Sequence, residues 1–177
     1  MKTELDYSIL GNRGWASWCM YAQAYHRFFG LLENTVKLSE LKVLDIGCGS
    51  GTWTRWYVEL GCDPNKIYGI DILPELIVES ELKNKSIHYK VSDIFNYADN
   101  SFDMITLNVA LMCISEKQRL VDKLYTMLND TGILVICDKQ EEFKQELFKK
   151  WNIVSVELCQ IGQLPIEHKF VVFRKAL

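Results

Sequence analysis

The stretch Val43-Leu44-Asp45-Ile46-Gly47-Cys48-Gly49-Ser50-Gly51-Thr52 decides the fold of this chain. Its first four residues are typical of a strand, three glycines follow at alternate positions, and a helical pattern runs from residue 52 to residue 60. A glycine loop between a strand and a helix lets a ligand approach the backbone at the helix N-terminus. A dinucleotide fingerprint would need its third glycine at position 52, and a P-loop would need a lysine after the loop, so neither motif is present.

Strand and helix patterns alternate along the rest of the chain. Strands are expected at residues 42–46, 66–71, 87–91, 102–108 and 132–137, and helices at 52–60, from Pro74 onward, at 116–128 and at 141–150, with a turn at 129–132. This alternation predicts an α/β fold with a parallel sheet and helices on both faces. Residues 153–161 and 169–174 are also strand-like, but the segment between them is too short for a parallel crossover. These last two strands must therefore pair antiparallel, which makes the sheet a mixed one.

The composition predicts a single folded domain over residues 1–177, because 49% of the residues are hydrophobic and 24% are charged. The 20 basic residues against 23 acidic ones give a net charge of −3, which disfavours a nucleic-acid-binding protein. No apolar run approaches the ~20 residues of a membrane span, and no signal peptide is visible, so we expect a cytoplasmic protein. The six cysteines form no CxxC pair and no Cys/His cluster, so no metal site is expected.

Polar side chains stand where successive strands of the expected sheet end. Asp71 closes the second strand, 20 residues beyond Gly51, where a carboxylate can accept hydrogen bonds from a ribose diol. Asp93 and Ile94 follow the third strand and are suited to an adenine amino group and ring face, and Asn108 ends the fourth strand. Because ligands bind at the carboxyl edge of such sheets, these residues and the glycine loop predict one nucleoside-binding site.

The segments VLDIGCGSGTW, YGIDILPELI, VSDIFNY, NSFDMITLNVALMCI and NDTGILVICD resemble motifs of the class I S-adenosylmethionine-dependent methyltransferases. The resemblance covers residues 41–138, and the antiparallel end is similar to the last two strands of that family. It implies a Rossmann-like, doubly wound mixed sheet of seven strands, with the last strand antiparallel. It also implies S-adenosyl-L-methionine as cofactor and S-adenosylhomocysteine as product. The cofactor-binding residues that it implies are Asp45, Gly47, Cys48, Gly49 and Gly51 at the methionine end, Asp71 and Ile72 at the ribose, Asp93 and Ile94 at the adenine, and Asn108 between methionine and acceptor.

Motifs that would identify the methyl acceptor are mostly absent. Amino methylation of a nucleobase usually shows [DN]PP[YF] after the fourth strand, where this chain has Asn108-Val109-Ala110-Leu111, and Cys113 lacks the preceding proline of a cytosine-C5 nucleophile. The chain also resembles small bacterial methyltransferases of surface-polysaccharide biosynthesis. We therefore expect methylation of a small molecule or glycan intermediate, at an oxygen such as a sugar hydroxyl. The alternatives are a protein or RNA methyltransferase with a docking partner, and a non-catalytic adenosyl-binding scaffold subunit.

Residues 1–34 are rich in aromatic side chains and show helical spacing from residue 15 to residue 33. Such a segment either packs on the sheet or closes over the site as a substrate lid, since Trp and Tyr can stack on a ring and keep a polar tip. His168 is expected in a turn before the last strand. The candidate substrate contacts are Arg13, Trp15 and Tyr25, and the candidate catalytic residues are His26, Asn108 and Tyr21.

Overall fold

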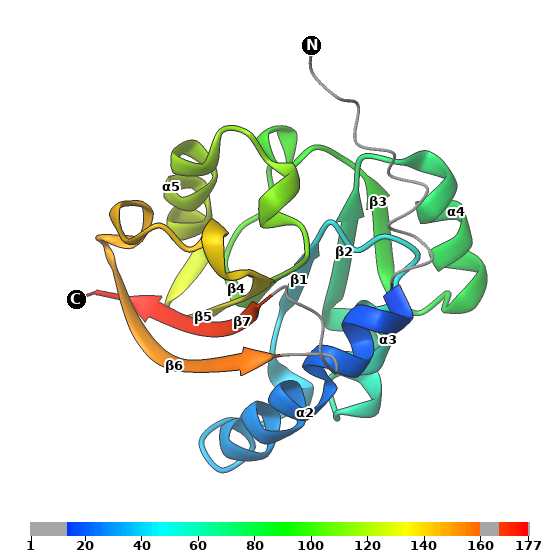
Figure 1. The fold of residues 1–177 in the computed structure, drawn as a ribbon. Coiled ribbons are helices and arrows are strands. Elements are labelled where there is room, and N and C mark those ends of the chain that lie inside the picture. Colours follow the sequence, from blue (N-terminus) through cyan, green and yellow to red (C-terminus); the bar gives the residue numbers. More distant parts are fainter. Residues whose placement is uncertain (1–13, 160–166, 177) are drawn as a thin grey trace.

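The computed structural model in Figure 1 describes residues 14–159 and 167–176, with only the backbone described for residues 14–20. The described residues form a seven-stranded sheet in the order β3-β2-β1-β4-β5-β7-β6. Its strands are β1 (Val43–Ile46), β2 (Ile67–Asp71), β3 (His88–Val91), β4 (Phe102–Asn108), β5 (Leu128–Lys139), β6 (Trp151–Cys159) and β7 (His168–Lys175).

Strands β1 to β5 run parallel, and β7 lies antiparallel between β5 and β6. The predicted mixed sheet of seven strands with an antiparallel last strand is therefore confirmed. β1 pairs with β2 on one side and with β4 on the other, so the strand order reverses direction at β1. Such a switch point opens a crevice at the carboxyl ends of the strands, which is where ligands bind in this architecture.

Helices cover both faces of the sheet, as predicted (Figure 1). On one face α2 (Gly14–Leu32) and α3 (Thr52–Glu59) pack on β1, β5 and β7 through a buried cluster that includes Tyr25, Tyr57 and Phe170. On the other face α5 (Lys117–Met127) buries Leu120, Val121, Leu124 and Met127. α4 (Pro74–Lys83) begins with proline at its first turn, a position where the missing N–H is not needed, and packs beside β2 and β3.

The segment between β5 and β6 corrects one prediction. In place of a helix over 141–150 the structure has two 3₁₀ turns, Gln140–Glu142 and Gln145–Phe148. Phe148 stacks on Phe173 of β7, with ring centroids 4.5 Å apart, and the chain has returned to the sheet by Trp151. Because these apolar side chains pack on the sheet directly, the segment has no room for a regular helix.

Two strand boundaries also differ from the prediction. β5 starts at Leu128, before the residues expected to form a turn, because Leu128 already pairs with Phe102; the pairing then skips to Met104 and Ile133, and the turn residues bulge between these pairs. β6 starts at Trp151, two residues earlier than expected, because that indole is buried. The expected residues 160 and 161 of this strand lie outside the described residues.

No helix in the described ranges is both long enough and apolar enough to cross a membrane.

Candidate active site

The glycine loop connects β1 to α3 at the carboxyl edge of the sheet. Gly47, Gly49 and Gly51 all have positive φ, and Gly51 caps the helix with a φ of 73°. A Cβ on Gly51 would lie 2.6 Å from the hydroxyl of Tyr89, and one on Gly47 would lie 2.8 Å from the Cβ of Ala110. These two glycines are required by close packing, whereas a Cβ on Gly49 would meet no atom of the described residues within 4 Å. Open space therefore lies beside the backbone of Gly49.

Asp71 holds the middle of this loop from the end of β2. One carboxylate oxygen accepts a hydrogen bond from the backbone N–H of Gly49 at 2.9 Å, and the other accepts one from Leu73 at 3.0 Å. Ser80 of α4 donates to the carbonyl oxygen of Gly49 at 3.0 Å. Each carboxylate oxygen has a second lone pair. Asp71 can therefore support the loop and still accept hydrogen bonds from a ligand diol.

The turn after β3 lies directly beside Asp71, because the N–H of Ser92 donates to the Asp71 carbonyl oxygen at 2.9 Å. Asp93 is exposed and caps the short turn Ile94–Asn96 by accepting from Phe95. Ile94 is 5% exposed and belongs to the core, so its side chain packs inward. Ile72, at 54% exposure, is an apolar side chain on this edge that is open to a ring.

Asp45 is a buried carboxylate that joins β1, α3 and β4. It accepts hydrogen bonds from Thr54 at 2.6 Å and from Thr106 at 2.9 Å, and a longer one from Asn108 at 3.4 Å. Burial raises the pKa of Asp45 to about 6, against the lowering effect of these donors. Because this pKa lies above that of the unfolded chain, the contribution of Asp45 to stability is largest in acid and is lost as the pH rises through about 6.

Asn108 is shared between the sheet and the two helices above it. Its amide nitrogen donates to the Tyr57 hydroxyl at 3.0 Å, and its amide oxygen accepts from the Tyr25 hydroxyl at 2.9 Å. Asn108 therefore connects Asp45 to α2 and α3. Both polar atoms of the Asn108 side chain are therefore hydrogen-bonded within the protein. Such a residue is suited to positioning its neighbours.

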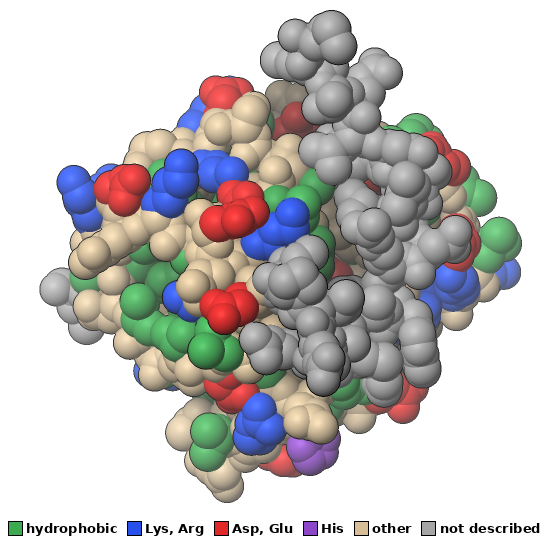
Figure 2. Space-filling model, viewed as in Figure 1, with side chains coloured by type: hydrophobic (Ala, Val, Ile, Leu, Met, Phe, Trp, Pro, Cys, Tyr) green, Lys and Arg blue, Asp and Glu red, His purple; other side chains and the backbone are tan. Residues whose placement is uncertain are grey.

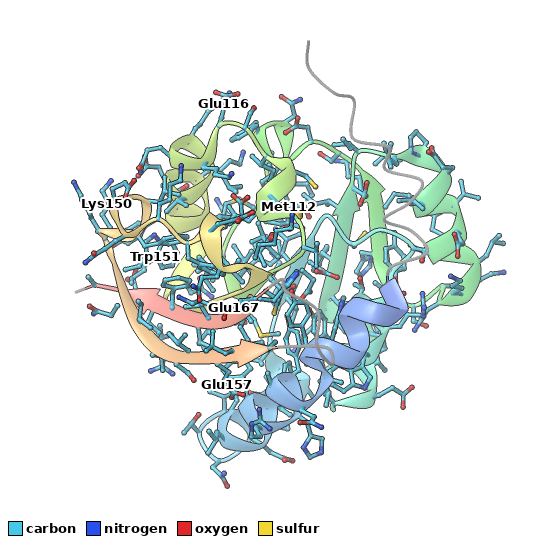
Figure 3. The ribbon with its side chains drawn as sticks, in the orientation of Figure 1. Met112, Glu116, Lys150, Trp151, Glu157 and Glu167 are labelled. Atoms are coloured by element: carbon cyan, nitrogen blue, oxygen red, sulfur yellow. The ribbon has the colours of Figure 1, made fainter. Side chains whose placement is uncertain are left out.

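The turn after β4 carries backbone strain. Val109 has a φ of 57°, which is unusual for a β-branched residue and costs on the order of 1–3 kcal/mol. Its N–H donates to the carbonyl oxygen of Cys137 at 2.7 Å, and the following Ala110 packs against Gly47. Asp138, at the end of β5, accepts a hydrogen bond from the N–H of Met112, which is labelled in Figure 3. The turn is thus fixed between the glycine loop and β5.

The described part of the aromatic N-terminal segment packs as core. Tyr21, Tyr25 and Phe29 of α2 are buried, whereas His26 is exposed on the opposite side of the helix. Arg27 forms an ion pair with Glu157 of β6, which is labelled in Figure 3. Arg13 lies outside the described residues, and of Trp15 only the backbone is described. The structure thus brings Tyr25 and Asn108 together and does not bring His26 to them.

His168 corrects the expectation of a turn residue, because it is the first residue of β7 and is 7% exposed. Its Nδ1 forms a hydrogen bond with the hydroxyl of Tyr21 from α2. Sequence reasoning missed this pair because 147 positions separate the two residues. Only the antiparallel return of β7 beside β5 brings them together.

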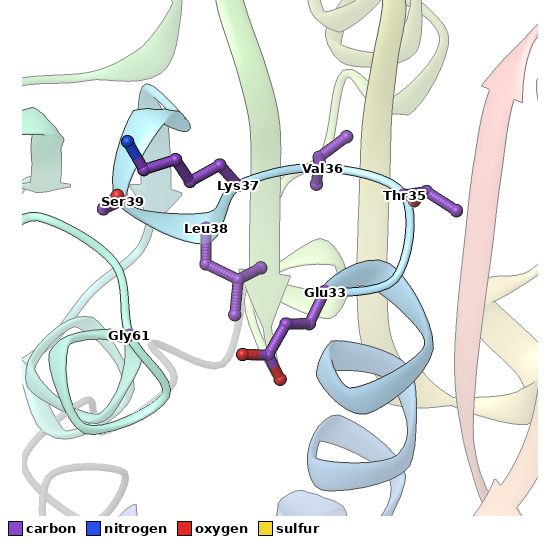
Figure 4. Close-up of a pocket in the computed structure, with 7 residues that line it drawn as sticks. All are labelled: Glu33, Thr35, Val36, Lys37, Leu38, Ser39 and Gly61. Carbon is purple, nitrogen blue, oxygen red and sulfur yellow. The ribbon is translucent and has the colours of Figure 1, made fainter.

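A cavity of about 450 Å³ lies away from this edge, beside the loop from α2 to β1 (Figure 4). Its wall consists of Glu33, Gly61 and residues 35–39. Lys37 and Glu40 pair with each other there, and the lining residues do not belong to the polar network described above. The cavity is therefore separate from the carboxyl edge of the sheet. Among the described residues no group of three potential metal ligands is found.

The carboxyl edge suits an adenosyl group. Free space beside Gly49 allows close approach to the backbone, Asp71 and Asp93 offer carboxylates at neighbouring strand ends, and Ile72, the residue after Asp71, exposes an apolar surface. These are the elements that a nucleoside site in this architecture requires.

A family model described as a methyltransferase domain matches residues 44–136, more than half of the chain. The chain belongs to this methyltransferase family. The resemblance to class I S-adenosylmethionine-dependent methyltransferases is thereby confirmed, together with the type of cofactor.

Relatives within this group differ in what they methylate. The chain is 28% identical over 116 residues to a malonyl-[acyl-carrier protein] O-methyltransferase of Enterobacter lignolyticus, covering 64% of this chain and 45% of that protein. It is 30% identical over 139 residues to a ribosomal protein L11 methyltransferase of Thermosipho africanus, covering 70% of this chain and 51% of that one. The chain thus spans about half the length of these relatives.

A solved structure shares the fold over nearly the whole chain. The magnesium protoporphyrin IX methyltransferase of Synechocystis, crystallised with S-adenosylmethionine, superimposes with a TM-score of 0.70 at 14% identity, covering 99% of this chain and 100% of that one. This likeness shows that the two methyltransferases share their fold.

Replacement of Gly49 by alanine tests the contact surface of the loop. Because the site of the new methyl group is open and the φ is 55°, Gly49→Ala should cost about 1–2 kcal/mol of stability yet still fold. The methyl group would occupy the space beside the backbone, so we expect at least a ten-fold loss of S-adenosylhomocysteine affinity in calorimetry. Gly30→Ala, in open space within α2, is the matched control and should leave affinity unchanged. Unchanged affinity of Gly49→Ala would show that the cofactor does not approach the loop.

Proposed function

We propose that this methyltransferase transfers a methyl group from S-adenosylmethionine to an oxygen of a small molecule or glycan intermediate. The observation that carries the cofactor part of the proposal is the hydrogen bond from Gly49 to Asp71, since it couples the glycine loop to the acid expected to bind the ribose. Bound S-adenosylmethionine supplies an electrophilic methyl group on a positively charged sulfur. The protein holds the acceptor in line with this methyl group, and such positioning supplies much of the acceleration of an in-line displacement.

Each part of the edge has a separate task in this proposal. Asp71 accepts from the ribose hydroxyls, Asp93 faces the adenine amino group and Ile72 covers the ring. The glycine loop and the turn after β4 meet where Gly47 contacts Ala110, which limits the space at the methionine end. Asn108, held by Tyr25 and Tyr57, keeps this end rigid.

The charge distribution supports a small acceptor over a nucleic acid. The chain carries a net charge of −3, and on the face shown in Figure 2 the Lys and Arg side chains are interspersed with Asp and Glu. Binding to a phosphate backbone relies on a concentrated basic surface. Several of the exposed lysines are also paired with carboxylates, for example Lys150 with Asp122.

One feature favours the alternative of a protein acceptor or partner. β6 is an edge strand, and four of its apolar side chains are exposed by 48% or more: Ile153, Val154, Val156 and Leu158. They contribute to the apolar patch over β6 in Figure 2. Exposed apolar edges of this kind often mark interaction sites.

Transfer of a labelled methyl group separates these functions. The protein is incubated with methyl-tritiated S-adenosylmethionine and a bacterial cell extract, which is then divided into small-molecule, protein and nucleic-acid fractions. We expect label in the small-molecule fraction, and much less of it with Gly49→Ala. Label confined to protein or RNA would contradict the small acceptor. Binding of S-adenosylhomocysteine without transfer to any fraction would identify a scaffold subunit.

Removal of residues 1–14 tests the proposed substrate lid. Because this stretch precedes the buried part of α2, the shortened protein should bind S-adenosylhomocysteine within a few-fold of the full chain. If the segment covers the acceptor, most of the methyl transfer in the same assay should be lost. An equal loss of cofactor affinity would instead assign the segment to the cofactor site, and full activity would show that it has no role in closure.

A further inference from the structure

His168 stands at the same edge of the sheet as the proposed cofactor site. Cys137 of β5 pairs with Asn108 on one side and with Phe170 on the other, and two residues further on Lys139 pairs with His168. With ~3.3 Å per residue and ~4.8 Å between strands, His168 lies roughly 7 Å beyond Asn108 along the strands and roughly 10 Å to its side. His168 therefore lies at the carboxyl edge of the sheet, on the β7 side of Asn108.

The imidazole of His168 is oriented by α2. Its Nδ1 is hydrogen-bonded to the Tyr21 hydroxyl, and the centroids of the two rings are 5.8 Å apart. Burial raises the pKa of Tyr21 far above its ordinary value, so this hydroxyl stays neutral. The proposed role requires the tautomer in which Nδ1–H donates to the tyrosine oxygen, because the lone pair of the neutral imidazole is then on Nε2. No hydrogen bond to Nε2 is found among the described residues.

A second polar group nearby has no hydrogen-bond partner within the part of the chain that the structure describes. The indole of Trp53, in the first turn of α3 after the glycine loop, is 5% exposed, and its Nε1 is buried without a hydrogen bond. The ring centroids of Trp53 and Tyr21 are 6.1 Å apart. A buried donor without a partner costs ~1–3 kcal/mol, which a bound ligand can recover. Tyr21 therefore contacts both a histidine and an indole whose Nε2 and Nε1, respectively, have no hydrogen-bond partner among the described residues.

From this placement we propose that His168 is the proton acceptor for a hydroxyl-bearing methyl acceptor, with Tyr21 as its positioning residue. This inference rests on the proposed methyltransferase function and deepens it. The acceptor oxygen forms a bond to the methyl carbon as the carbon–sulfur bond breaks and its electron pair stays on sulfur. The hydroxyl proton moves to Nε2 of His168 and later leaves to solvent. The Trp53 indole donates to a polar atom of the acceptor.

The charged and titratable groups around His168 suit this role. Burial, followed by the nearby Lys139 ammonium, lowers the pKa of His168 below its ordinary value, so the ring is neutral at pH 7. Asp138 of β5 is near Tyr21, and burial raises the pKa of Asp138 to about 6. Cys159 of β6 pairs with His168 across the sheet, and burial raises the pKa of its thiol to about 11.

The other two histidines of the chain do not share this environment. His26 is exposed on α2, and His88 of β3 bonds to the backbone carbonyl oxygen of Asn65. A general base is needed for a hydroxyl, whose pKa lies well above 7, and is not needed for an acceptor that is already ionised. A buried neutral imidazole at this edge therefore favours a hydroxyl acceptor over a thiolate or carboxylate.

A matched pair of probe acceptors tests the assignment. 4-Cresol has a phenolic hydroxyl that is protonated at pH 8 (phenol pKa ~10), whereas 4-methylbenzenethiol is largely ionised at that pH. Methyl transfer from S-adenosylmethionine to each probe, at millimolar concentration, is followed by mass spectrometry. For His168→Gln we expect a loss of about 100-fold with 4-cresol, while the thiol rate and the S-adenosylhomocysteine affinity stay within a few-fold. Tyr21→Phe should lower the 4-cresol rate several-fold, and His88→Gln, the matched control, should change nothing.

The pH profile provides a second readout. With 4-cresol the wild-type rate should rise through the pKa of His168, below 6.5, and then level off, because the base must be neutral to accept a proton. This rise of the rate with pH should be absent in His168→Gln. Equal losses with both probes, an unchanged 4-cresol rate, or wild-type transfer to the thiol alone would overturn the role of His168. Absence of both transfer and S-adenosylhomocysteine binding would instead overturn the proposed function itself.

Discussion

The buried carboxylate of Asp45 is the interaction on which the rest of the site depends. It ends no strand and faces no solvent, yet it accepts hydrogen bonds from α3, β4 and the side chain of Asn108. Burying a carboxylate is costly, and these donors offset the cost only if all of them stay in place. The carboxylate therefore fixes β1, the helix after the glycine loop and the end of β4 as one rigid unit.

The hydrogen bonds around Asp45 continue into further contacts on both sides of the crevice. On one side the glycine loop is held by Asp71 and Ser80, which leaves Gly49 open to a ligand. On the other side Asn108 carries the constraint to Tyr25, and α2 carries it on to Tyr21 and His168. The cofactor edge and the proposed acceptor side are thus two ends of one hydrogen-bonded network. Such a network can hold the two reactants in position, which supplies the catalytic advantage.

The sequence predicted those parts of the structure that depend on residues close to one another in the chain. The glycine loop, the strand-end acids and the antiparallel last strand could be inferred because each depends on a few neighbouring residues. The 3₁₀ turns before β6 could not, since the packing of Phe148 on Phe173 replaces a helix there. The pairing of Tyr21 with His168 and the inward packing of Ile94 were also hidden, because both depend on contacts between distant segments.

Calorimetric titration of the wild-type protein with S-adenosylhomocysteine, and separately with NAD, tests the central claim that the carboxyl edge is an adenosyl-methionine site. We expect micromolar affinity for S-adenosylhomocysteine, ~8 kcal/mol of binding free energy, and no measurable heat with NAD. Tight binding of NAD with no response to S-adenosylhomocysteine would contradict this claim.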